Sequence, residues 1–174
     1  MMMRVLIVFW LFGIVVGLGL TGIWSAAVGQ EARLQVSITA ISDGDSLRAG
    51  KLRLRLHGID APEKNQLCST ASGESYACGQ QAADWLRSQI SPGQRLSCVL
   101  LDTDRYRRLI VQCFKEDMDL NQAVVRAGWA LAYTRYSDAY IQAEQQARAE
   151  RIGLWQGPFM RPEEWRRQKR ELKK

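Results

Sequence analysis

The stretch from residue 43 to residue 63 holds the side chains whose types and spacing can do chemistry. Four carboxylates and two arginines are carried there on short segments: Asp43, Asp45, Arg53, Arg55, Asp60 and Glu63. Ca²⁺ and Mg²⁺ prefer oxygen ligands, and a guanidinium matches a phosphate with two parallel hydrogen bonds. Together these residues indicate a hard metal ion beside a phosphate.

Each piece of this stretch also has a purely structural interpretation. The Asp-Gly-Asp sequence at 43–45 is as typical of a plain hairpin turn as of a metal site. The Asp-Ala-Pro-Glu sequence at 60–63 fits a helix N-cap followed by its capping-box glutamate. The stretch alone leaves both interpretations open.

Short strands are predicted around the first acidic group. Residues 34–41 alternate apolar and polar side chains, which is the period of a half-buried strand. A second strand begins at Leu47 after the Asp-Gly turn, and residues 52–57 form a third with one apolar and one basic face. Residues 60–75 are loop-like. Two further strands, 96–101 and 109–114, are joined near residues 104–108.

Helices are predicted between and after these strands. The first covers about 75–90 and ends before Pro92. Asp119 fits the N-cap of a second, with Gln122 at N3 and Gly128 at its end. A third is capped by Ser137 and stopped by Gly153 after Ile152. The last opens at 162–164 and has a Lys-rich end that suits the helix dipole.

This order of elements predicts an α+β fold that is mainly β. Five short strands with an inserted helix suit a five-stranded OB-fold barrel with three packed helices. An N-terminal signal or transmembrane helix and a C-terminal basic helix complete the expected organisation. The expected domains are residues 1–29 (signal peptide or membrane anchor), 30–160 (barrel domain) and 161–174 (basic helix or tail).

Charge is concentrated at the C-terminus. The net charge is +6, of which residues 161–174 carry +4 from seven Lys/Arg and three Glu. Apart from Arg4, this leaves residues 31–160 nearly neutral, with 16 basic and 15 acidic side chains. Such a tail either attracts nucleic acid or anionic lipid, or is simply a solvated helix.

The N-terminus predicts export. Val5 to Trp24 is a nearly unbroken apolar run of 20 residues, which is long enough to span a bilayer. Residues 27–29 provide small residues for a cleavage site before Gln30. A cleaved signal peptide and a retained membrane anchor are both compatible with this pattern; a buried helix of the soluble domain is the third alternative.

The cysteine count agrees with export. The four cysteines lack C-x-x-C pairs and the chain has one histidine, which disfavours a zinc site. An even number in an exported chain indicates two disulfides, with free buried thiols as the alternative. Three pairings are possible, and the expected 96–114 hairpin favours Cys98 with Cys113, which leaves Cys68 with Cys78.

The pieces, taken in order, resemble the staphylococcal-nuclease (thermonuclease) family. The resemblance runs from about Leu34 to Trp155. Its signposts are the sequences at 43–46, 55–63, 104–108, 120–121, 128–130 and 144–155. Their joint order and spacing is far more specific than any single one.

The resemblance implies a role for each matching residue. Asp45 and Asp60 match carboxylate ligands of a catalytic Ca²⁺, Ala61 would supply a backbone carbonyl, and Asp43 matches a supporting acid behind them. Glu63 matches the residue that positions or deprotonates the attacking water. The remaining matches are the phosphate-clamping arginines Arg55 and Arg108, and the nucleotide-pocket residues Arg105, Tyr106 and Tyr133.

One departure from the family pattern concerns the second arginine. The family usually has Gly before it, whereas this chain has Arg107. If that position needs a left-handed backbone, an arginine there costs about 1–2 kcal/mol. If the turn shifts to avoid this cost, either Arg107 or Arg108 could face the phosphate. We expect Arg108 to be the phosphate ligand.

The leading functional hypothesis is an exported Ca²⁺-dependent endonuclease. It would hydrolyse phosphodiester bonds of DNA or RNA to 3′-phosphate products as a monomer. The protein would be periplasmic or secreted, with membrane contact through the N-terminal helix if that helix is retained. The alternatives are a non-catalytic OB-fold nucleic-acid-binding module, and an accessory protein of the envelope or of extracellular polysaccharide production.

Overall fold

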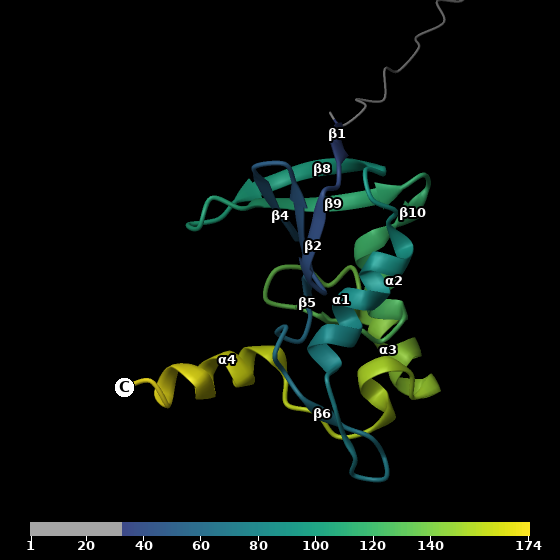
Figure 1. Ribbon diagram of the computed structural model, residues 1–174. Helices are drawn as coiled ribbons and strands as arrows, with labels where there is room; N and C mark the ends of the chain where they lie inside the picture. Colours follow the sequence, from purple (N-terminus) through teal and green to yellow (C-terminus); the bar gives the residue numbers. More distant parts are fainter. Residues whose placement is uncertain (1–32) are drawn as a thin grey trace, which may run out of the picture. The chain divides into compact units, whose positions relative to one another are not determined.

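The computed structural model describes residues 33–174 (Figure 1). The expected signal peptide or membrane anchor and its boundary near residue 29 lie outside the described residues. Between residues 33 and 174 no helix combines the length and the apolar character that a membrane span requires. The described part has an α+β fold, with a mainly strand sheet and four α-helices.

One sheet contains most of the strands, in the order β1-β8-β9-β4-β3-β2, with β10 paired to β9. The bounds are β1 Arg33–Ser37, β2 Ala40–Asp43, β3 Ser46–Ala49, β4 Leu52–Leu56, β8 Arg95–Thr103, β9 Leu109–Lys115 and β10 Met118–Asp119. Neighbouring strands are antiparallel except β4 and β9. That parallel pair sets Leu54 opposite Leu109 and Arg55 opposite Ile110.

The two ends of this strand order are joined by a short link. β1 and β2 stand at opposite ends, yet only residues 38 and 39 separate them in the chain. The Ile38 N–H donates to the Gln94 carbonyl next to β8, and the Thr39 N–H donates to the Arg48 carbonyl of β3. The sheet therefore curls until its ends meet, as a barrel does. The sequence predicted one strand here, but the structure splits it because each half pairs with a different partner.

Two short strand pairs were not predicted from the sequence. β5 (Ile59–Asp60) pairs with β11 (Leu131–Ala132), and β6 (Cys68–Ser69) pairs with β7 (Ser75–Tyr76). Of these strands, β6 lies within the segment 60–75 that was predicted as loop. Two residues are too few to show an alternating pattern, so no periodicity in the sequence marks them.

The helices follow the predicted order (Figure 1). They are α1 Cys78–Gln89, α2 Leu120–Arg126, α3 Ile141–Glu150 and α4 Pro162–Glu171, with a 3-10 turn, η1, at Gly153–Gln156. Asp119 caps α2 as expected, because its carboxylate accepts the Gln122 N–H at 3.1 Å. Ser137 does not cap α3: its hydroxyl accepts the Ala139 N–H and α3 begins only at Ile141.

Both predicted disulfide pairings are confirmed. Cys98 and Cys113 face each other in the β8–β9 register, with Cα atoms 4.1 Å apart. Cys68 and Cys78 join the β6 loop to the start of α1, with Cα atoms 5.6 Å apart. Two disulfides point to an oxidising environment.

Asn121 is a fully buried polar residue that fastens α2 to the sheet. Its side-chain oxygen accepts the Cys113 N–H at 3.1 Å. Its amide nitrogen donates to the carbonyls of His57 and Val111, at 3.0 and 3.2 Å. The three bonds join β9, the end of β4 and α2, the elements that carry both halves of the candidate site.

Asn121→Ala is expected to lower the free energy of unfolding by about 2–4 kcal/mol, because it leaves buried backbone groups without partners. Chemical denaturation measures this change. Asn65→Ala, at an exposed asparagine, is the matched control and is expected to change stability by less than about 0.5 kcal/mol. Equal effects of the two substitutions would contradict the structural role of Asn121.

Candidate active site

Asp45 and Asp60 are buried carboxylates, with exposed fractions of 1% and 3%. Asp45 lies in the tight turn between β2 and β3, directly after Gly44. One of its oxygens accepts the Ala61 N–H at 2.8 Å, and the other accepts the Ser46 hydroxyl at 3.0 Å. The Asp43 carboxylate accepts the Asp45 N–H at 3.2 Å and so stabilises the turn.

The turn lies close against Ala61 and α1. A Cβ placed on Gly44 would come within 2.8 Å of the Cβ atoms of both Ala61 and Ala82. Glycine is therefore required at position 44 by close packing. This packing keeps Asp45 next to the backbone that leads from Asp60 to Glu63.

Arg55 joins the two buried aspartates. It extends from β4, forms an ion pair with Asp45, and donates to Asp60 and to the Ile59 carbonyl, each at 3.2 Å. Burial lowers the pKa of Arg55, and the nearby Arg108 guanidinium acts in the same direction, while Asp60 and Asp43 oppose the shift.

Arg166 of α4 is the second cationic partner of this group. One of its guanidinium nitrogens lies 2.9 Å from an Asp60 oxygen and 2.9 Å from a Glu63 oxygen. The other nitrogen donates to the second Asp60 oxygen at 2.9 Å. Burial by itself would lower the pKa of Arg166, but the bonds to Asp60 and Glu63 outweigh it and raise the pKa.

Arg108 comes from the turn between β8 and β9. The Asp104 carboxylate accepts the backbone N–H groups of Tyr106 and Arg108, each at 2.9 Å, and the Arg108 Nε at 2.8 Å. Burial raises the pKa of Asp104, but these Arg108 bonds outweigh it and the net pKa is lowered. Arg107 has the left-handed backbone considered above, with φ at 59°, and Arg108 lines the pocket described next.

A pocket of about 710 Å³ unites the two halves of the site, within the size range of small-ligand sites. Of the residues proposed from the sequence, its walls include Arg55, Glu63, Arg105, Tyr106, Arg108 and Tyr133. Among the described residues, Asp43, Asp45, Asp60 and Ala61 lie outside its lining. The buried aspartates contact the pocket through the arginines that they bind.

Aromatic side chains stand on the pocket wall. Tyr106 is 55% exposed, and the guanidinium carbon of Arg105 lies 4.9 Å from its ring centroid. The rings of Tyr133 and Tyr136 meet edge to face at 5.0 Å. Burial, together with the charge of Glu163, raises the pKa of Tyr133, which keeps its phenol neutral. Aromatic rings on a pocket wall can stack with a nucleobase.

The pocket residues that the sequence analysis did not propose include Tyr136, Arg166 and Arg170. Tyr136 follows Tyr133 by three residues, a spacing that could have drawn attention to it. Arg166 and Arg170 have the i, i+4 spacing of one helix face, but the basic composition around them does not show what that face contacts.

The acidic residues have the donor chemistry that a hard cation needs. Asp45 and Asp60 supply carboxylate oxygens in a buried place, where a negative charge requires a positive partner. In this arrangement guanidinium groups fill that need. Among residues 33–174 no three His, Cys, Asp or Glu side chains are grouped so as to hold a metal ion.

Comparison with known proteins assigns the family. The model of the family described as "Staphylococcal nuclease homologue" matches residues 53–157, more than half of the chain. The chain belongs to the staphylococcal nuclease homologue family. The matched segment contains Arg55, Asp60, Glu63 and Arg108, and it ends before α4.

Curated relatives have several names. "Succinoglycan biosynthesis protein ExoI" of Rhizobium meliloti (strain 1021) is 31% identical over 67% of this chain and 62% of that protein. The chain thus covers slightly less than two thirds of that relative. An "Uncharacterized endonuclease" of Haemophilus influenzae is 33% identical over 76% of this chain and 73% of its own. Another "Uncharacterized endonuclease", of Escherichia coli O157:H7, is 33% identical over 68% of this chain and 74% of that protein.

Arg107→Gly is expected to raise the free energy of unfolding by about 1 kcal/mol. Left-handed backbone costs an ordinary residue about 1–2 kcal/mol, which exceeds the roughly 0.5–1 kcal/mol entropic cost of glycine. Lys51→Gly is the control, at an exposed turn residue whose φ is not positive, and it is expected to lose stability. Chemical denaturation of both variants measures whether the free energy of unfolding rises or falls. A lower free energy of unfolding in both variants would contradict backbone strain at Arg107.

Proposed function

We propose that this member of the staphylococcal nuclease homologue family is a nuclease that hydrolyses phosphodiester bonds of DNA or RNA. The observation that carries the proposal is the linked charge group Asp45–Arg55–Asp60–Arg166–Glu63 next to a pocket that Arg108 also lines. The relatives named endonuclease support the same class of reaction. We further propose that the products carry a 3′-phosphate and that the protein is a monomer. Its fold is proposed to be an OB-type barrel over residues 30–160, followed by a basic helix or tail at 161–174.

Ca²⁺ is the proposed cofactor. Asp45 and Asp60 would hold it, with the Ala61 carbonyl as a neutral ligand and Asp43 supporting Asp45. The bound ion would supply positive charge beside the phosphate and offset the negative charge that develops during hydrolysis.

The chain's own side chains carry out the remaining steps. Glu63 positions the attacking water and accepts its proton. Arg55 and Arg108 bind the equatorial phosphate oxygens and stabilise the charge that grows on them, because they are held in place before the reaction begins. The Asp104 carboxylate keeps Arg108 oriented through the Nε bond.

Arg105, Tyr106 and Tyr133 are proposed to bind the nucleotide. Tyr106 stacks with a base while Arg105 neutralises a neighbouring phosphate. A base can stack only when it is unpaired, so single-stranded or frayed nucleic acid is the favoured substrate.

Export is proposed for this nuclease. The two disulfides support an oxidising compartment, either periplasmic or extracellular. The apolar run at residues 5–24 would act as a signal peptide, or as an anchor that keeps the protein in contact with the inner membrane.

The full-length chain is expected to cleave single-stranded DNA with Ca²⁺ and to lose this activity when a chelator is added. Glu63→Ala and Arg108→Ala are each expected to lower kcat by about 10²–10³-fold, the effect of losing one preorganised group. Arg107→Ala is the matched control, since it removes the same charge from the adjacent residue outside the pocket lining. A cleavage rate that is unchanged both by the chelator and by Glu63→Ala would rule out the proposal.

A second candidate, an accessory role in extracellular polysaccharide production, is favoured by the name of the ExoI relative. It predicts that a succinoglycan-type polymer, rather than single-stranded DNA, raises the thermal unfolding temperature of the Glu63→Ala protein. The nuclease proposal predicts the reverse order of protection. A thermal shift assay with both polymers distinguishes the two.

A further inference from the structure

Arg166 binds the carboxylate oxygens of Asp60 and Glu63, which a metal ion at Asp60 would also need. Its two terminal nitrogens bind both oxygens of Asp60, and one of them also binds Glu63, each at 2.9 Å. A guanidinium in this bidentate geometry satisfies both carboxylate oxygens. Asp60 then has little capacity left for a cation, and Glu63 is held as an ion pair.

Arg166 differs in this respect from Arg55. Arg55 contacts one Asp60 oxygen at 3.2 Å and otherwise binds Asp45 and a backbone carbonyl. Arg55 therefore leaves the second Asp60 oxygen available. Only the helix α4 (yellow in Figure 1) brings a cation, among the described residues, to both oxygens of Asp60 and to Glu63.

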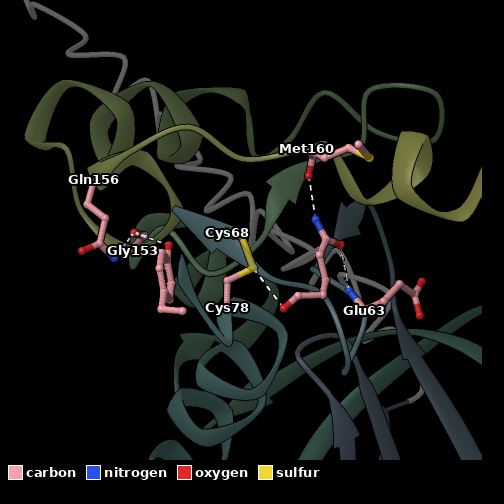
Figure 2. Close-up of a disulfide and its surroundings, with 8 residues drawn as sticks. Glu63, Cys68, Cys78, Gly153, Gln156 and Met160 are labelled. Atoms are coloured by element: carbon pink, nitrogen blue, oxygen red, sulfur yellow. Dashed lines mark hydrogen bonds between the residues drawn. A yellow bond between two sulfur atoms is a disulfide. The ribbon is translucent and has the colours of Figure 1, made fainter. Parts of the chain in front are cut away.

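The segment before α4 is fastened to the body of the protein. The buried Gln66 side chain donates to the Met160 carbonyl at 2.7 Å and accepts the Glu63 N–H at 3.2 Å. Figure 2 shows Met160 and Glu63 near the Cys68–Cys78 disulfide. The Ser69 N–H donates to the Pro158 carbonyl at 3.1 Å. The start of α4 is thus held to the same loop that carries Glu63.

The helix itself is held much more weakly than its start. Beyond Arg166, its ion pair to the body is Arg135–Glu163, at 3.5 Å between side chains that are 66% and 47% exposed, and such exposed pairs contribute little. The Arg166 side chain is 28% exposed, so water can reach it. A firm anchor followed by a weakly held helix lets Arg166 leave the site while the chain stays attached.

We propose that α4 is an autoinhibitory element in which Arg166 competes with the metal ion for Asp60 and Glu63. With α4 docked, Asp60 is unavailable to the ion and Glu63 cannot accept a proton from water. Binding of Ca²⁺ displaces Arg166, frees Glu63 and opens the pocket wall that Arg166 and Arg170 form. This inference rests on the proposed calcium site at Asp45 and Asp60.

Competition of this kind is reciprocal. Because the ion and Arg166 bind the same oxygens, docking of α4 weakens Ca²⁺ binding by the same factor by which Ca²⁺ weakens docking. Removing the Arg166 charge must therefore tighten calcium binding. If Arg166 had a purely structural role, substituting it would leave the affinity for Ca²⁺ unchanged. If Arg166 supported the calcium site, substituting it would weaken Ca²⁺ binding.

The test measures Ca²⁺ binding to the full-length chain by titration calorimetry. Arg166→Gln keeps a polar side chain but removes the charge, and Arg166→Ala removes both; each is expected to lower the Kd for Ca²⁺ at least about tenfold. Arg167→Ala is the matched control, because it removes the same charge from the exposed neighbour on α4 and should leave the Kd unchanged. Thermal unfolding of each variant verifies that it folds.

Hydrogen exchange of residues 162–171 provides a readout that is independent of activity. Ca²⁺ is expected to raise exchange in α4 of the wild-type protein, and Arg166→Gln is expected to raise it without Ca²⁺. Equal Ca²⁺ affinity in the wild-type and Arg166 variants would overturn the competition and leave the proposed nuclease intact. Failure of every variant to bind Ca²⁺ would overturn the calcium site and the competition together.

Discussion

The burial of two carboxylates is the constraint on which the rest of the site depends. Asp45 and Asp60 are nearly inaccessible to water, and a buried negative charge is tolerated only with a positive partner and hydrogen bonds. Asp45 obtains these from Ser46, Ala61 and Arg55. Asp60 obtains its partners from one arginine of the sheet and one of the terminal helix. The same need for positive charge makes the pair suited to a metal ion.

The parallel pairing of β4 and β9 joins the two halves of the site. Arg55 and Arg108 are separated by more than fifty residues, yet the register that sets Leu54 opposite Leu109 brings them to one pocket. The Asn121 side chain, which comes from α2, secures this arrangement by bonding to Val111 and Cys113 of β9 and to His57 just after β4. The β4–β9 register thus determines how the two arginines are placed relative to each other.

The terminal helix changes how the basic tail is understood. Its charge invites comparison with a solvated helix or a nucleic-acid-binding patch, but one of its arginines enters the candidate active site. The family match ends before this helix. The matched segment therefore contains Asp60 and Glu63 but not Arg166, which contacts both of them.

The sequence by itself determined the family, the order of the longer strands and the helices, and the disulfide pairing, and it indicated the acidic and arginine residues of the candidate site. These are encoded in local patterns: alternation, capping residues, cysteines facing across a hairpin, and motifs at fixed spacing. Only the tertiary structure decided the split of the first strand, the contact of Arg166 with Asp60 and Glu63, and the place of Tyr136 in the pocket. Each of these depends on which segments meet after folding, and the identity of a distant partner leaves no periodic or local signal in the chain.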